Sequence, residues 1–86
     1  MMEKIGEKVS VNCVYNHETG KVTPMLLKWK NHLYHIGKVG LHYTLYRGET
    51  LIHLFSVCDD DRYFLLSLNT KTLTWTLEEI ADEITN

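Results

Sequence analysis

The sequence predicts a small, mostly β domain: a strongly bent antiparallel sheet or an SH3-like small barrel, with a short C-terminal helix. Three observations predict this fold class. Apolar and polar residues alternate with a period of two over most of the chain, which is typical of half-buried strands. Turn-forming residues separate these stretches at short intervals. Near the C-terminus the apolar spacing changes to three and four residues, which is typical of a helix.

The first half of the chain predicts two strands and the turn between them. The first strand covers residues 8–15, where four apolar residues alternate with polar ones: Val9, Val11, Cys13 and Tyr15. Residues 16–21 predict a turn, because asparagine and glycine tolerate positive φ. The second strand covers residues 22–30. Pro24 lacks a backbone N–H, so that end of the strand is expected at a sheet edge or a bulge.

Five further strands are expected after a tight turn at residues 31–32. One begins at Leu33, and the next continues through residues 41–47. Gly37 and Gly40 predict a bulge or a sharp bend between them. A turn at residues 47–49 precedes a strand at 50–58, and three aspartates at 59–61 connect it to a strand at 62–68. A turn at 69–71 then leads into a last strand at 72–76.

A C-terminal helix is predicted from a stripe of apolar residues at helical spacing, namely Leu77, Ile80, Ala81 and Ile84. Thr76 and Glu79 fit a capping box at its start, and Trp75 and Ile80 have the spacing of a hydrophobic staple. A helix this short is unstable alone in water. We therefore expect it to dock on the sheet.

Residues 51–55 and 63–66 are apolar on both faces of their strands. A sheet with one wet face has no need of a second apolar face. Either the sheet curls into a barrel that the helix partly covers, or a second copy covers it, which predicts a homodimer. The expected core comprises ten residues: Val9, Val11, Cys13, Trp29, Ile36, Leu54, Leu66, Trp75, Ile80 and Ile84.

Length and composition limit the alternatives. The 86 residues are expected to form a single domain over 1–86. A net charge of −2 argues against strong nonspecific binding of nucleic acid by the whole molecule. Cys13 and Cys58 form no CxxC pair and are expected as reduced, buried thiols, with a single disulfide left as the alternative. The start resembles no signal peptide, and no apolar run is long enough to span a bilayer. We expect a cytoplasmic protein.

The sequence feature whose charge suggests a partner is a basic segment, residues 21–48. It carries +5 and no acidic residue, so the rest of the chain carries −7. Aromatic residues lie in the same segment, and single-stranded nucleic-acid platforms combine cations with aromatics. The candidate binding surface consists of Lys28, Lys30, Lys38, Arg47 and Tyr46. Strand parity, however, places Trp29 on the core side and its neighbours Lys28 and Lys30 on a solvated face.

Catalytic and metal sites are not predicted. The chain has no glycine-rich phosphate loop, no GxSxG elbow and no HExxH or CxxC ligand pair. His32 and His35 lie three residues apart, which puts them on opposite faces of a strand. The aspartates at 59–61 are explained by turn formation and solubility. We therefore predict no enzyme, no cofactor and no metal.

The segment from Trp29 to Ile36 has the pattern W-x-G/N-x-x-Y-x-V/I, with Asn31 where glycine is common. With the late Trp75, it resembles small bacterial β-domains of unknown function over about residues 24–77. Those families have no assigned activity that the resemblance could transfer to a residue here.

Together these observations predict a small non-catalytic interaction or accessory module that binds a protein partner or a second copy of itself. Its binding surface would be an apolar patch or an open strand edge. The alternative is a nucleic-acid-binding module that uses the basic segment. No membrane partner is expected.

Overall fold

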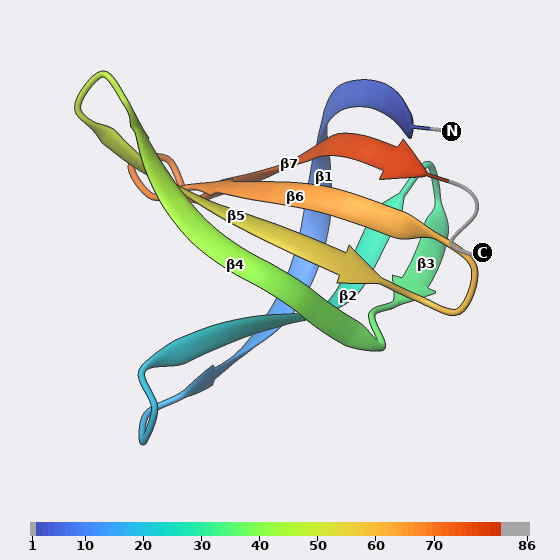
Figure 1. Ribbon diagram of the computed structural model, residues 1–86, viewed down its shortest axis with the longest axis horizontal. Coiled ribbons are helices and arrows are strands. Elements are labelled where there is room, and N and C mark those ends of the chain that lie inside the picture. Colours follow the sequence, from blue (N-terminus) through green and yellow to red (C-terminus); the bar gives the residue numbers. More distant parts are fainter. Residues whose placement is uncertain (1, 82–86) are drawn as a thin grey trace.

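A computed structural model describes residues 2–81 of the protein, which form seven antiparallel strands and no helix. The strands are β1 (Met2–Asn16), β2 (Lys21–Trp29), β3 (His32–His35), β4 (Lys38–Arg47), β5 (Thr50–Cys58), β6 (Tyr63–Asn69) and β7 (Thr74–Ala81). They form one sheet in the order β3-β2-β1-β7-β6-β5-β4 (Figure 1). The prediction of a mostly β, antiparallel protein is confirmed.

The sheet bends because its longest strand, β1, changes partner halfway along. Residues Met2 to Val9 pair with β7, whereas Ser10 to Asn16 pair with β2. The two halves of the sheet then turn their inner faces toward each other, so that the Tyr34 ring of β3 lies 5.2 Å from the Phe64 ring of β6. The order ends at β3 and β4, which do not pair with each other. The fold is therefore the bent sheet, and it is not a closed SH3-like barrel.

The core lies between the two halves of the sheet. Its buried members are Leu27, Ile36, Phe55, Val57, Phe64, Leu66, Trp75, Leu77 and Ile80. Among the residues expected in the core, five are buried: Ile36, Leu54, Leu66, Trp75 and Ile80. Three more are half-buried against the core: Val9, Val11 and Trp29.

The prediction that Cys13 belongs to the core is wrong, because its side chain is exposed. Cys13 lies in the part of the β1–β2 hairpin that extends past the pairing of β1 with β7. Ile84 lies outside the described residues. Both Cys13 and Cys58 are free thiols, and Cys58 is half-buried.

Two turns of identical design follow Asn16 and Asn69. In each, the asparagine Oδ1 accepts hydrogen bonds from the backbone N–H groups two and three residues later. The asparagine carbonyl accepts a third bond, at 2.7 Å, from the N–H four residues later. That fourth residue has positive φ: it is Gly20 in the first turn and Leu73 in the second. Both turns were predicted.

The β2–β3 and β4–β5 hairpins use two-residue turns. The predicted turn at 31–32 lies one residue earlier, at Lys30 and Asn31, because Trp29 pairs directly with His32. Both turn residues have positive φ, 52° and 64°, as a type I′ turn requires. The predicted turn after Arg47 has Gly48 at φ 62°.

Bulges bend the strands where proline and glycine predicted irregularity. In β2, Met25 is the extra residue between Leu26, which pairs with Asn12, and Pro24, which pairs with Cys13. Gly40 is the extra residue in β4. A bulge increases local twist and bends its strand, so these positions contribute to the curvature of the sheet.

The predicted C-terminal helix is wrong for residues 76–81, which belong to strand β7. The cause is a bulge. Leu65 pairs with Glu79 and Leu66 with Leu77, so Glu78 is an extra residue in β7. This insertion separates the inward-facing Leu77 and Ile80 by three positions instead of two. A bulged strand thus reproduces the spacing of a helix. The remainder of the predicted helix lies outside the described residues.

No helix in the described part of the chain has the length and apolar character needed to cross a membrane.

Candidate functional site

The structure does not bring the five predicted binding residues together. Lys28 and Lys30 flank Trp29 at the end of β2. Lys38 begins β4 and pairs with Cys58. Tyr46 and Arg47 lie beside the β4–β5 turn, and as consecutive strand residues they face opposite sides of the sheet. The predicted surface is thus divided among three places.

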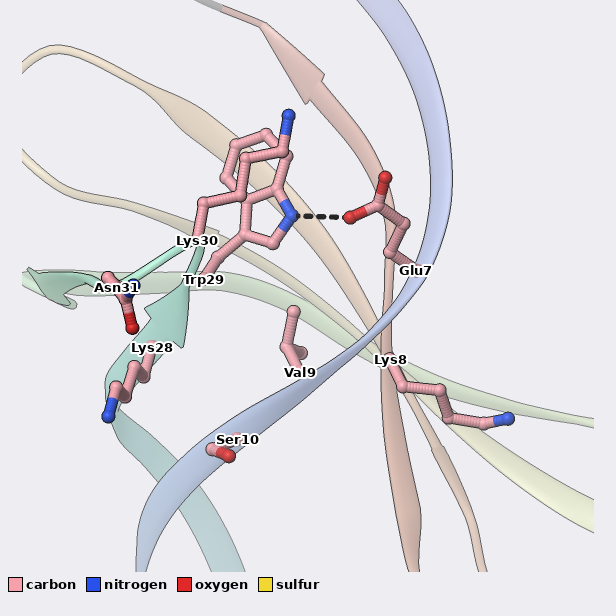
Figure 2. Close-up of a pocket in the computed structure, with 8 residues that line it drawn as sticks. All are labelled: Glu7, Lys8, Val9, Ser10, Lys28, Trp29, Lys30 and Asn31. Carbon is pink, nitrogen blue, oxygen red and sulfur yellow. Dashed lines mark hydrogen bonds between the residues drawn. The ribbon is translucent and has the colours of Figure 1, made fainter.

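Lys28 and Lys30 border a shallow hollow of about 450 Å³ at the point where β1 changes partner. Figure 2 shows Trp29 at its centre, with its indole N–H donating to Oε1 of Glu7 at 2.9 Å. The Lys30 ammonium lies 4.8 Å from the centre of the Trp29 ring. Lys8 joins the hollow from β1, but Figure 2 shows its amino group and that of Lys28 directed to opposite sides. The lysines therefore surround the hollow without converging in it.

A second surface is apolar and lies on the outer side of β4, β5 and β6, facing away from the core. We call it the outer patch; it consists of Leu41, Tyr43, Leu45, Ile52, Leu54 and Leu65. The strand register places these side chains on one face. Ile52 and Leu54 are buried there, whereas Leu41 and Tyr43 are 58% and 42% exposed.

The outer patch borders a free strand edge. β4 is the last strand of the sheet, so one side of its backbone has no strand partner. Between Lys38 and Arg47 it contains no charged residue and no proline, although charges and proline are the usual protection of an edge strand. β3, the strand at the other edge, has only four residues. Short edges are themselves protected, so β4, which has a bulge at Gly40 and no charge or proline beyond it up to Tyr46, is the less protected edge of the described sheet.

At the rim of the outer patch, Arg47 lies 3.9 Å from Glu78. Glu78 also accepts a 2.6 Å hydrogen bond from the buried Ser67 hydroxyl. The bulge in β7 places the carboxylate on this outer face beside Ser67. Arg47 therefore lies at the border of the outer patch. The sequence had suggested that it belongs to a solvated basic surface.

The third surface is a groove of about 510 Å³ between the start of β2 and β4. Its walls are Lys21, Val22 and Thr23 on one side and Val39, Gly40 and His42 on the other, and Phe55 also lines it. Figure 1 shows the β1–β2 and β4–β5 hairpins diverging on this side of the molecule. The groove thus separates two strands that the sheet does not join.

A histidine pair lies on the inner face at this groove. Nε2 of His42 is 2.8 Å from Nδ1 of His53, and the His42 ring stacks on Phe55 with ring centres 4.2 Å apart. One of the two nitrogens must donate and the other accept. Burial lowers the pKa of His42, and the nearby His53 and Lys21 lower it further. The groove therefore favours the neutral form of His42, and Lys21 is the one charged side chain among the described residues that line it.

The sequence does contain a signal for the histidine pair. A two-residue turn after Arg47 places His42 opposite Phe55 and diagonally adjacent to His53, and diagonal neighbours on one face are within side-chain reach. No such signal predicts that Lys21 lies near His42 or that Glu7 contacts Trp29, because both contacts depend on how the sheet bends.

Among residues 2–81, no three histidine, cysteine, aspartate or glutamate side chains come together in a way that could hold a metal ion.

No family model matches this chain, and searches of curated proteins and of solved structures found no match. The resemblance to small bacterial β-domains stays a prediction.

Proposed function

We propose that this protein is a small non-catalytic interaction module that associates with a second copy of itself through the outer patch. The observation that carries the proposal is the apolar outer side of β4, β5 and β6, where Leu41 and Tyr43 remain exposed beside buried Ile52 and Leu54. Contiguous apolar surface of this kind marks interaction sites.

The charge pattern supports a second copy as the occupant. The outer patch itself has no charged member, and the ion pair at its rim joins opposite charges, so two copies related by a two-fold axis avoid a like-charge excess. Such isologous contacts are the commonest form of oligomer.

Sedimentation velocity of the wild-type chain over a concentration series tests this proposal. We expect the weight-average mass to approach twice the mass of the chain at roughly tens of micromolar, the range of a modest interface. A mass that stays at that of one chain throughout would contradict the proposal.

The nucleic-acid alternative has less support. In its favour, Lys8 lies at the same hollow as Lys28 and Lys30. Against it, Lys38 and Arg47 lie elsewhere, and Trp29 is already engaged by Glu7 and Lys30. A base that stacked there would have to displace the ammonium. We therefore retain the interaction module as the proposed function.

A further inference from the structure

The groove between β2 and β4 has the form of a site for an added strand. It lies between the free edge of β4 and the first residues of β2, and β3 pairs only with the later part of β2, Leu26 to Trp29. At one end the chain itself closes the gap, through the bonds of Ile36 N–H to the Met25 carbonyl and of Gly37 N–H to the Cys58 carbonyl. Beyond this closure the two strands are separate.

The two walls of the groove are not equivalent. Pro24 cannot donate a backbone hydrogen bond, and Lys21 is charged; both features discourage strand pairing along β2. The run from Leu41 to Tyr46 in β4 has neither proline nor charge. An incoming strand would therefore pair with β4, and β2 would act as a side wall that contributes Lys21 and Thr23.

The chemistry of the occupant follows from the two faces of β4. On the inner face an added strand meets His42, with His53 and Lys21 nearby, and no acidic side chain is among the described residues that line the groove. On the outer face it meets Leu41 and Tyr43. Because side chains of a strand alternate between faces, acidic residues would alternate with apolar ones.

From this geometry we infer that the groove binds an extended peptide of a partner protein, in which acidic and apolar residues alternate, as an added strand on β4. This is recognition by strand addition, in which backbone hydrogen bonds give affinity and alternate side chains give specificity. The inference rests on the free edge of β4 and on the inner-face groove rather than on self-association, and the two proposals share only Leu41 and Tyr43 at the border of the outer patch.

Selection from a phage-displayed library of random linear peptides, with the full chain as bait, tests the inference. We expect enriched peptides to alternate acidic and apolar residues. The consensus peptide, labelled with fluorescein, should bind in an anisotropy titration. Lys21→Glu should weaken that binding by about tenfold, since it places a like charge opposite the acidic residue. Lys30→Glu, which reverses an exposed lysine at the other hollow, should change it by less than about twofold.

Backbone methylation of the peptide separates strand addition from other binding modes. Only alternate amides of an edge-paired strand face β4. Methylating one alternate set should therefore abolish binding, and methylating the other should preserve it. Equal tolerance of both sets, equal binding by Lys21→Glu, or no enriched pattern would each overturn the inference.

The inference and the proposed function can fail separately. Lys21→Glu should leave the sedimentation mass of the wild type unchanged, because Lys21 is not in the outer patch. If Lys21→Glu abolished self-association, the groove would hold a strand of a second copy, and the assignment to a partner peptide would be wrong.

Discussion

At the scale of single residues, Leu73 is the clearest case of a residue whose backbone conformation does not suit it. It has φ of 60° and is 72% exposed, so its side chain contributes almost no burial. Gly20 occupies the same place in the equivalent turn after Asn16. Positive φ costs a non-glycine residue roughly 1–2 kcal/mol, and nothing in the turn offsets this cost.

Leu73→Gly should therefore stabilise the protein. The relief of strain is partly cancelled by the greater freedom of glycine in the unfolded chain, so we expect a net gain of about 0.5–1 kcal/mol. Urea denaturation would measure it. The reciprocal change, Gly20→Leu, should destabilise the protein by a similar amount. A loss of stability in Leu73→Gly would show that the leucine makes a contribution this account does not include.

His42 gives the stability of the fold a dependence on pH. Burial, His53 on β5 and Lys21 on β2 lower its pKa below the 6.5 of an unperturbed histidine, so the folded state binds fewer protons than the unfolded state. The contribution of His42 to stability is therefore present above pH 6.5 and is lost as the pH falls through its folded-state pKa. His42 is exposed, so the effect should be small.

Melting temperatures from about pH 7.5 to about pH 5 would test this dependence. The decrease on acidification should be smaller in His42→Asn than in the wild type. His17→Asn, which changes a histidine in the β1–β2 turn outside the groove, is the matched control. An equal decrease in His42→Asn and the wild type would exclude the role of His42.

At the scale of elements, β7 shows how a bulge controls the curvature of the sheet. Glu78 is extra relative to β6, and β1 has one further residue than β7 between Lys4 and Glu7, where Gly6 has φ of 67°. Each insertion adds twist. The two insertions lie at the same level of the sheet, a few residues before β1 changes partner after Val9, and they contribute to its bend.

The stability of the Thr76→Val variant distinguishes strand β7 from the helix that the apolar spacing predicts after Thr76. In a helix, Thr76 would be the N-cap, and its loss would cost about 1 kcal/mol. In β7 it faces the outer side beside Ser67, where a β-branched apolar residue is well tolerated. We therefore expect the free energy of unfolding to change by less than about 0.5 kcal/mol. A loss of 1 kcal/mol or more would favour the cap.

The sequence predicted most strands and turns because their signals are local. Asn16, Gly20, Gly48 and Asn69 determine turns through their own conformational preferences. The first residues of β1 were missed because polar residues dominate them. The end of β7 was missed because an inserted residue changes the period, and a period cannot separate a bulged strand from a short helix.

At the scale of the whole molecule, the candidate sites depend on the bend rather than on local sequence. Residues 21–48 do carry a net charge of +5, but the fold places these charges on separate surfaces. Lys21 borders the groove, Lys28 and Lys30 border the hollow, and Arg47 borders the outer patch. Only a two-sided apolar pattern, at residues 51–55 and 63–66, predicted one of these surfaces directly.

The dispersed charges also predict weak binding of nucleic acid. Phosphate contacts release counterions, so binding that depends on them weakens steeply with salt. We expect little anisotropy change with random single-stranded DNA or RNA at low salt, and none at physiological salt. Tight, salt-sensitive binding that Lys28→Glu weakens would favour the alternative function.

The central claim is that the outer patch is the surface through which two copies meet. Sedimentation of two leucine variants at the same concentration tests it most directly. Leu41 and Leu33 are exposed to a similar degree, 58% and 61%, and lie on the two opposite edge strands. Leu41→Glu places a charge in the outer patch and should give the mass of a single chain, whereas Leu33→Glu should sediment as the wild type does. An associated Leu41→Glu, or equal dissociation of both variants, would contradict the claim.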